Sequence, residues 1–201
     1  VAAWEAQAAR QAGLVDVVSR ASELRFVAPG TDIRLRVDGR TWRSSAANRN
    51  LPDGEVFTGP IEDSADGVVE FSYPVVRDGR VIEGIRLAFE AGRVVEASAR
   101  RGEDVLLALL DQDEGARRLG EVGIGTNFGL DRFTGQILLD EKIGGSFHLA
   151  VGAGYPETGS TNRSGEHWDM ICDLRAGGEI QADGVTIQRD GRFLEASGYG
   201  A

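Results

Sequence analysis

The sequence predicts an α+β fold: a predominantly antiparallel β-sheet domain with two or three helices. Three observations support this class. Apolar residues alternate with polar ones over several short segments, dipeptide turns such as Asp-Gly and Gly-Gly separate these segments, and helical spacing is confined to two stretches. We find no internal repeat and no linker that would divide the chain, so we predict one domain over residues 1–201.

The first half of the chain is predicted to hold one helix followed by strands. Residues 1–24 are predicted as helix, because an Ala-rich stretch is followed by apolar residues at helical spacing. Strand follows over residues 33–37, where apolar residues alternate with arginine, and Asp38-Gly39 is predicted to form a hairpin turn. The strand pattern continues over residues 67–99, with a turn at Ala91-Gly92 that returns the chain antiparallel.

The second half contains the most regular helical pattern, followed by a region without one. Residues 103–119 carry an apolar stripe at helical spacing, with acidic residues at the start and arginines at the end, and Gly120 fits as the stop. Residues 120–165 are rich in Gly, Asn, Thr and Ser, so we expect functional loops there. Short strands are predicted to close the chain at 168–174, 179–182 and 185–188.

Composition limits the partners and the location of the protein. Apolar residues make up 41% of the chain, which is enough for a packed core. A net charge of -10 and the lack of a basic stripe argue against a nucleic-acid partner. The absence of a long apolar run argues against a membrane span. A single cysteine, Cys172, and no recognisable export signal predict a cytoplasmic protein. The chain begins without Met, which suggests a piece of a longer protein.

Two histidines are the first candidates for chemistry. His167-Trp168-Asp169 puts an imidazole and a carboxylate at i and i+2 of a predicted strand, so both side chains point to one face and suit a divalent metal. His148 follows the pair Gly144-Gly145, which permits close backbone packing, and precedes an apolar run. Taken singly, His167 equally fits a surface residue beside an acid, and His148 a hydrogen-bonded core residue.

Two carboxylates stand out by context. Glu55 follows a turn sequence and opens an apolar segment, and Glu121 opens a Gly-rich segment after the predicted helix. Each equally fits a solvated strand end. Other chemistries find less support: the glycines over 123–129 lack the dinucleotide-loop spacing, no Gly-x-Ser-x-Gly elbow occurs, and Cys172 lies in an apolar stretch.

Five segments, taken in order, carry a more specific signal. They are GTDI (30–33), NLPDGEVFTGP (50–60), GEVGIGTN (120–127), DEKIGGSFHLAVG (140–152) and HWDM (167–170). Any one of them is a weak motif. Together they span nearly the whole chain, which in this respect resembles the C-terminal half of the aminopeptidase T / aminopeptidase S family of metallo-aminopeptidases.

The resemblance implies a metal-dependent aminopeptidase with a two-metal site. The metal ligands that it implies are Glu55, Glu121, His148, His167 and Asp169. Either Glu55 or Glu121 would be the carboxylate shared by both metals, and Glu121 is thereby also counted among the catalytic residues. Tyr155 matches an active-site tyrosine of the family and would donate to the developing oxyanion. Glu141 would be a ligand or the general base.

The same resemblance implies cofactors and partners. Two divalent metal ions are expected, with Zn, Co or Mn suited to the mixed carboxylate and imidazole set and Mg a weaker candidate. Expected partners are peptide substrates with a free N-terminus and a second copy in a homodimer. Family members are longer, so residues 1–201 would be the catalytic C-terminal domain with its N-terminal domain absent. The alternatives are a metal-binding or dimerisation domain inactive without that half, an interaction protein, and another metallohydrolase such as a carboxypeptidase or deacylase.

Overall fold

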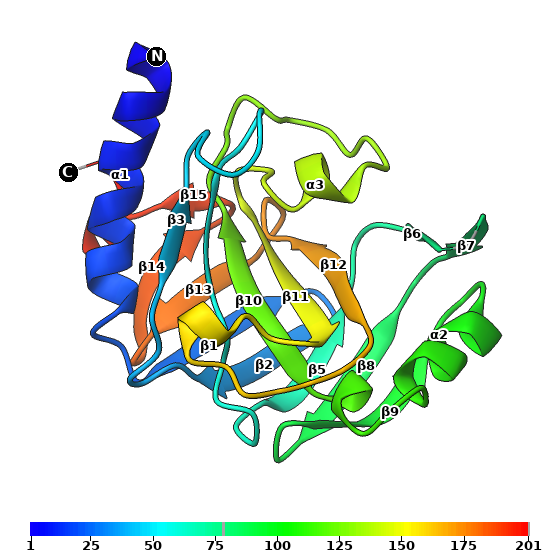
Figure 1. Cartoon of the computed structure of the whole chain (residues 1–201). Helices are drawn as coiled ribbons and strands as arrows, with labels where there is room; N and C mark the ends of the chain where they lie inside the picture. The colour runs from blue at the N-terminus through cyan, green and yellow to red at the C-terminus, as the bar shows by residue number, and fades with distance from the viewer. Residues whose placement is uncertain (78, 201) are drawn as a thin grey trace.

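Two antiparallel sheets lie face to face in the computed structural model, which describes residues 1–77 and 79–200 (Figure 1). The larger sheet has the strand order β15-β14-β13-β1-β2-β5-β8-β9 and the smaller one β12-β11-β10-β4-β3. The larger sheet consists of β1 (Glu23–Ala28), β2 (Thr31–Arg36), β5 (Asp66–Glu70), β8 (Arg86–Glu90), β9 (Arg93–Ser98), β13 (Glu179–Ala182), β14 (Val185–Arg189) and β15 (Arg192–Phe193). The smaller sheet consists of β3 (Arg43–Ser45), β4 (Glu55–Thr58), β10 (Leu119–Gly125), β11 (Ser146–Gly152) and β12 (His167–Asp173). All pairings within both sheets are antiparallel, which confirms the predicted α+β class.

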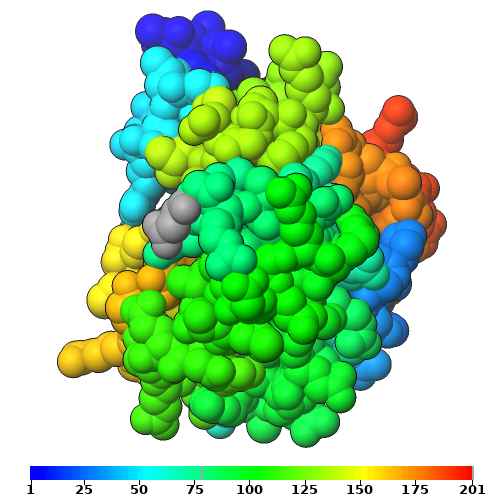
Figure 2. Space-filling model, turned by 90° about the vertical axis from the view of Figure 1, so that its right-hand side faces the viewer, coloured from blue at the N-terminus to red at the C-terminus, as the bar shows by residue number. Residues whose placement is uncertain are grey.

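Three helices, three short 3-10 turns and one hairpin complete the described residues. The helices are α1 (Ala2–Val18), α2 (Glu103–Leu110) and α3 (Ile137–Asp140), and the hairpin pairs β6 (Val75–Arg77) with β7 (Arg80–Ile82). The 3-10 turns are η1 (Gly115–Arg117), η2 (Pro156–Thr158) and η3 (Glu195–Ser197). The hairpin and α2 lie on one side of the molecule, the side that Figure 2 shows. Within the described ranges, none of the helices combines the length and the apolar character needed to cross a bilayer.

The core fills the space between the two sheets. Phe26 of β1 stacks on Phe147 of β11, with ring centroids 4.3 Å apart, and thereby joins the sheets. Leu24, Ile33 and Leu35 are also fully buried in the same cluster. Each such side chain contributes on the order of 1.5–3 kcal/mol by leaving water. This core holds the smaller sheet rigidly, and that sheet carries the candidate site on its other face.

Helix α1 ends earlier than the predicted 1–24. The helix stops at Val18 because the following residues turn, and Leu24 and Phe26 then alternate inward in β1. The helix is fixed by two buried glutamines. Gln7 and Gln11 each donate from their Nε2 to Thr126, at the end of β10, and Gln11 also donates to the Ser45 carbonyl of β3.

The predicted helix over 103–119 was wrong beyond Leu110. Asp113 ends it locally, because its carboxylate accepts the N–H of Ala116 at 2.9 Å and of Gly165 at 2.8 Å, which starts a 3-10 turn instead. Leu119 already belongs to β10. Gly120 therefore lies inside a strand, where a Cβ would meet the Ala153 carbonyl oxygen at 2.2 Å.

The Gly-rich region 120–165 is also less loop-like than predicted. It contains most of β10 and all of β11, whose residues are buried throughout. A strand buried on both faces shows no alternation of apolar and polar residues, so its signal is lost in the sequence.

The strand predictions over 33–37 and 67–99 and near the C-terminus were largely right. β2, β8, β9, β12, β13 and β14 fall where the alternation placed them, and Ala91-Gly92 turns between β8 and β9. The predicted hairpin at Asp38-Gly39 was wrong. That turn carries the chain from β2 of the larger sheet to β3 of the smaller sheet, past the buried Trp42.

Candidate metal centre

Four neighbouring strands of the smaller sheet carry the candidate ligands. Side chains alternate along each strand, so Val122 and Ile124 of β10 enter the core while Glu121 lies on the opposite face. The register puts Glu121 of β10 beside Ala150 of β11 and Ala150 beside Asp169 of β12, in one row across three strands. Segments far apart in the sequence are thereby brought to one place on a rigid surface.

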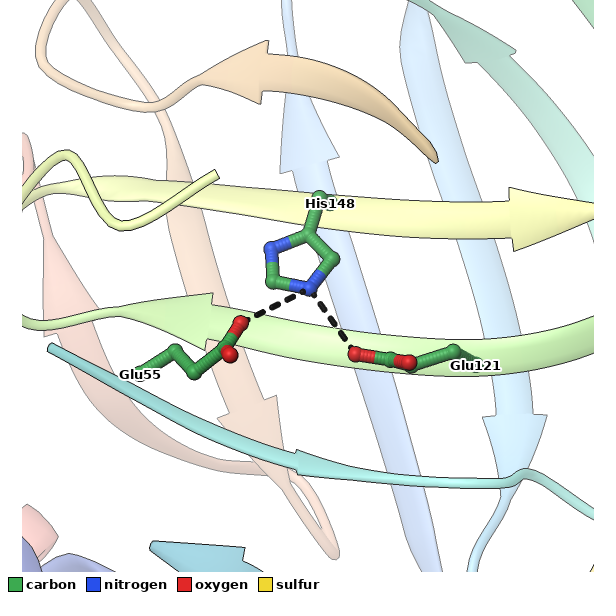
Figure 3. A group of neighbouring side chains, drawn as sticks. All are labelled: Glu55, Glu121 and His148. Carbon is green, nitrogen blue, oxygen red and sulfur yellow. Dashed lines mark hydrogen bonds and ion pairs between the residues drawn. The ribbon is translucent and has the colours of Figure 1, made fainter. Parts of the chain in front are cut away.

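His148 of β11 lies between two carboxylates (Figure 3). Its Nε2 is 3.2 Å from Glu121 Oε1 and 3.4 Å from Glu55 Oε2. Its Nδ1 is 3.1 Å from the Glu141 carbonyl oxygen. A carbonyl oxygen can only accept, so Nδ1 carries a proton, and Nε2 is the nitrogen left to face the carboxylates.

His167, the first residue of β12, is oriented in the same way. Its Nδ1 donates to the Ala153 carbonyl at 2.7 Å. Its Nε2 is 3.4 Å from Asp169 Oδ2 and 3.5 Å from Glu121 Oε2. The predicted convergence of His167 and Asp169 from their i, i+2 spacing is therefore right. Glu121 faces one imidazole with each of its two oxygens.

Burial and crowding shift the pKa values of these groups. Burial raises the pKa of Glu55 to about 7, with nearby His148 and Lys142 acting in the opposite direction. Burial raises the pKa of Glu121 as well. Burial alone would lower the pKa of both histidines, but Glu121 and Glu55 raise the pKa of His148 to about 10, and Asp169 raises that of His167 to about 9. Cation binding here would have to displace protons from both rings.

Lys142 is a site residue that the sequence analysis missed. Its side chain is fully buried, and its Nζ donates to Glu55 Oε1 at 2.9 Å and to Glu141 Oε1. The ammonium occupies one oxygen of Glu55, so the other oxygen, Oε2, faces His148. A signal was available in the sequence. The chain has 22 lysines and arginines, and Lys142 is the only lysine among them.

Gly123 is the second missed residue. It pairs with His148 across β10 and β11, and a Cβ on it would lie 2.1 Å from both Cε1 and Nε2 of that ring. A side chain at position 123 would therefore push the imidazole out of place. The lack of a side chain at position 123 makes room for a candidate ligand. The sequence analysis tested these glycines only for the spacing of a dinucleotide-binding loop, so it did not detect this role.

The loop before β4 is held by Asp53, which positions Glu55. The fully buried Asp53 carboxylate accepts from Ser45 Oγ, the Ala47 N–H and the Gly54 N–H, each at 2.9 Å. Burial opposes ionisation, but the hydrogen bonds from Ser45, Gly54 and Asn50 and the charge of Lys142 together lower the pKa of Asp53. The charged carboxylate thus organises the loop by accepting several hydrogen bonds at once.

A cavity of about 260 Å³ opens above this face. Six predicted site residues line it: Glu55, Glu121, Glu141, Tyr155, His167 and Asp169. His148 lies beneath them, so the structure brings all seven predicted residues to one site. The Tyr155 ring packs on His167 with centroids 5.0 Å apart, and burial with nearby carboxylates raises the Tyr155 pKa to about 12. The Tyr155 hydroxyl is therefore a proton donor at neutral pH.

The donor set fits a divalent metal. Two buried carboxylate oxygens, Glu55 Oε2 and Asp169 Oδ1, accept no hydrogen bond from any described residue. Glu55 Oε2 has the ion pair with His148 Nε2 at 3.4 Å, and buried oxygens that accept no hydrogen bond are costly unless another group binds them. Candidate ligand atoms lie within 4.8 Å of one another in three overlapping groups, and Glu121 belongs to two of these. Mixed carboxylate and imidazole sets suit Zn, Mn and related ions. The ligand roles of the individual residues stay a prediction.

Fold and site together define a class: an α+β protein with a carboxylate and imidazole centre of the kind that holds divalent metals. Comparison with known proteins narrows this class. The family model for thermophilic metalloproteases (M29) matches residues 1–193. The chain belongs to this metalloprotease family, which implies a divalent metal cofactor and confirms the resemblance found in the sequence.

Individual relatives agree with the family. The chain is 38% identical to "Aminopeptidase T" of Thermus aquaticus over 96% of its own length and 55% of the relative's. It is 35% identical to "Aminopeptidase 2" of Geobacillus stearothermophilus, covering 96% of this chain and 52% of that protein. The chain thus spans about half the length of these relatives.

Solved structures share the fold. Wild-type AmpT from Thermus thermophilus superimposes with a TM-score of 0.85 at 33% identity, over 96% of this chain and 55% of that one. A 2,5-dihydroxypyridine dioxygenase from Pseudomonas putida reaches a TM-score of 0.74 at 17% identity, over 96% of this chain and 61% of that one. The second likeness concerns the fold alone.

Proposed function

We propose that this chain carries the catalytic centre of a metallo-aminopeptidase, which removes the first residue of peptides with the help of two divalent metal ions. Glu55, Glu121, His148, His167 and Asp169 would hold the metals. The observation that carries the proposal is the position of Glu121, whose two oxygens face the Nε2 atoms of two different histidines, at 3.2 and 3.5 Å. This arrangement favours Glu121 over Glu55 as the shared carboxylate.

When bound, the metal pair would supply Lewis acidity and lower the pKa of water, so that hydroxide forms near neutral pH. Zn, Co and Mn suit the ligand set, with Mg weaker. The chain's own residues would do the rest. Glu141 lines the cavity with a carboxylate anchored by Lys142, which suits it to accept a proton and return it to the departing amine. Tyr155, protonated at neutral pH, would donate to the oxygen that gains negative charge.

The charge of the cavity supports a substrate with a free N-terminus. Four carboxylates line it, Glu55, Glu121, Glu141 and Asp169. With Glu55, Glu121 and Asp169 engaged by the metals, a free α-amine could bind a metal or the remaining acid, Glu141, whereas an acylated N-terminus offers neither a free amine nor a charge and adds bulk. The names of the relatives at 35–38% identity point to the same activity.

Two substitutions test the proposal in the metal-loaded full-length protein. Glu121→Gln and His167→Ala should each lower the metal content of the protein, measured by elemental analysis. Each should also slow the hydrolysis of aminoacyl-anilides about 100-fold or more. Glu90→Gln removes an exposed acid of β8 and serves as the control. Parent-like metal content and rates in both site variants would contradict the proposal. Cleavage of N-acetylated peptides at the rate of free ones would point instead to another metallohydrolase.

A second candidate function rests on the length of the chain. Because it spans about half of its relatives, residues 1–201 alone could be a metal-binding or dimerisation domain that is inactive without an N-terminal half. Comparing metal content, oligomeric state and anilide hydrolysis of residues 1–201 with those of the full-length protein separates the two. Bound metal without turnover in the shorter chain would favour this second function.

A further inference from the structure

The outer edge of β12 has unpaired backbone groups beside the metal centre. β12 is an edge strand, so its backbone pairs with β11 on one side only. On the other side, Ser72 donates its N–H to the Ile171 carbonyl at 2.9 Å. Because direction alternates along a strand, the backbone of Asp169 points to the same outer side as that of Ile171. Among the described residues, none hydrogen-bonds to the Asp169 N–H or C=O, or to the Ile171 N–H.

A second cavity, of about 290 Å³, runs along this edge. Its walls include Val76 of the β6–β7 hairpin on one side and Phe133 and Ile137 of the α3 segment on the other. Both walls lie on the side of the molecule shown in Figure 2, where the yellow-green α3 segment lies above the blue-green hairpin. His167 and Asp169 line this cavity as well as the metal cavity, so the two are adjacent.

Unpaired N–H and C=O groups along a strand edge recognise another extended chain, because they can form the next ladder of a sheet. A groove that gives access to such an edge and adjoins a metal centre is suited to a peptide main chain. We infer that the outer edge of β12 binds the peptide substrate beyond its first residue, as an added strand. This inference rests on the proposed aminopeptidase function and names how that site holds its substrate.

The geometry assigns Asp169 two tasks on two sides. Its side chain faces the metal centre, and its backbone N–H and C=O face the groove. A peptide paired with Asp169 would lie about one strand spacing, roughly 4.8 Å, from β12. Its first peptide bond would thus be held relative to the metal ligands by bonds that do not depend on side chains. Apolar walls such as Val76 and Phe133 would contact side chains of alternate substrate residues.

Peptide binding tests this inference independently of turnover. The probe is a hexapeptide whose first peptide bond is replaced by an uncleavable methyleneamino link, which leaves four later amides, titrated into the metal-loaded full-length protein. A set of analogues carries one N-methyl group on each later amide in turn. In an added strand every second N–H faces the partner, so methylation should weaken binding about tenfold at alternate positions and little between them. An effect that is equal at all positions, or absent, would overturn the inference.

Amide hydrogen exchange provides a second readout. The probe peptide should slow exchange at Asp169 and Ile171, whose N–H groups would become hydrogen-bonded. If both amides are already protected in the full-length protein without peptide, another part of that protein covers the edge and the inference fails.

A variant that narrows the groove separates this inference from the proposed function. Val76→Trp should raise the KM for tetrapeptides about tenfold while leaving aminoacyl-anilide hydrolysis unchanged, because anilides lack the later residues. Val185→Trp on β14 is the matched control, since the two valines are 59% and 55% exposed. Equal KM values for tetrapeptides in both variants would contradict the groove. If no substrate is hydrolysed while the alternating N-methyl pattern persists, the proposed function fails and the peptide site stands.

Discussion

Replacing Lys142 by Met removes the buried ammonium that separates Glu55 from Glu141 and keeps most of the apolar stem. Without this charge two buried carboxylates face each other, and one of them takes up a proton. At pH 7, protonating a glutamate whose ordinary pKa is about 4.3 costs about 3.7 kcal/mol, since each pH unit is worth about 1.36 kcal/mol. Removing one partner of a buried ion pair costs a similar amount, about 3–5 kcal/mol.

The expected loss in the free energy of unfolding is somewhat smaller than these figures. Burial already raises the pKa of Glu55 to about 7, so the parent protein bears part of the cost. We expect Lys142→Met to lower the free energy of unfolding of the metal-free protein by about 3 kcal/mol at pH 7. Urea unfolding in the presence of a chelator measures this.

The pH dependence distinguishes this cause from lost packing. The carboxyl that stays protonated in the folded variant has a pKa raised above its unfolded value. Its contribution to stability is present at low pH and is lost as pH rises. Because burial already raises the pKa of Glu55 in the parent to about 7, the two pH profiles run nearly parallel below pH 7, and the variant's deficit should grow mainly above it, by up to about 1.4 kcal/mol per pH unit. Lys142→Arg retains the charge and should follow the pH profile of the parent, even if the larger side chain costs stability. A deficit in Lys142→Met that is independent of pH would refute the reasoning.

Two further predictions concern other parts of the sheet. Gly123→Ala should weaken metal binding about 10–100-fold in a metal titration, because the added methyl would displace His148, whereas Gly129→Ala, outside the strand, should bind as the parent does. Asp173→Asn removes the carboxylate bound by Arg175, whose hydrogen bonds outweigh burial and lower the Asp173 pKa. It should cost about 1 kcal/mol at pH 7. The stabilisation from a lowered pKa is full above the ordinary value near 4 and is lost as pH falls from there through the lowered pKa of the folded state. The stabilities of parent and variant should therefore converge in acid, and a constant difference down to pH 2 would count against this ion pair.

Half-buried strands could be predicted from the sequence, and fully buried ones could not. β2 alternates apolar residues with arginine because one face packs on the core and the other meets solvent. β10 and β11 are buried throughout and carry glycines where the site needs room, so they resemble loops in composition. The predicted helix over 103–119 was too long because the apolar stripe continued through residues that are buried in other ways, in a 3-10 turn and a strand.

Some residues of the candidate site could also be predicted from the sequence, and others could not. His167 and Asp169 could be paired from their spacing, because two residues apart on a strand means one face. The contacts of His148 with Glu55 and Glu121 depend on strand order and register, which are not local properties of the sequence. Lys142 was missed because a buried lysine contradicts its usual exposure, and only its two carboxylate partners, one of them 87 residues away, explain it.

The candidate metal ligands lie on the sheet, whereas the candidate base lies on a segment outside it. Glu121, His148 and Asp169 project from adjacent antiparallel strands that are fixed by the core beneath them, so their mutual positions hardly depend on what binds. Glu141, the candidate base, instead lies at the end of the one-turn helix α3, outside the sheet. The same segment contributes Leu138 to the metal cavity and Ile137 to the groove along β12. A peptide held on the β12 edge would therefore touch the segment that carries the base, which gives the later residues of a substrate a physical route to affect its turnover as well as its binding.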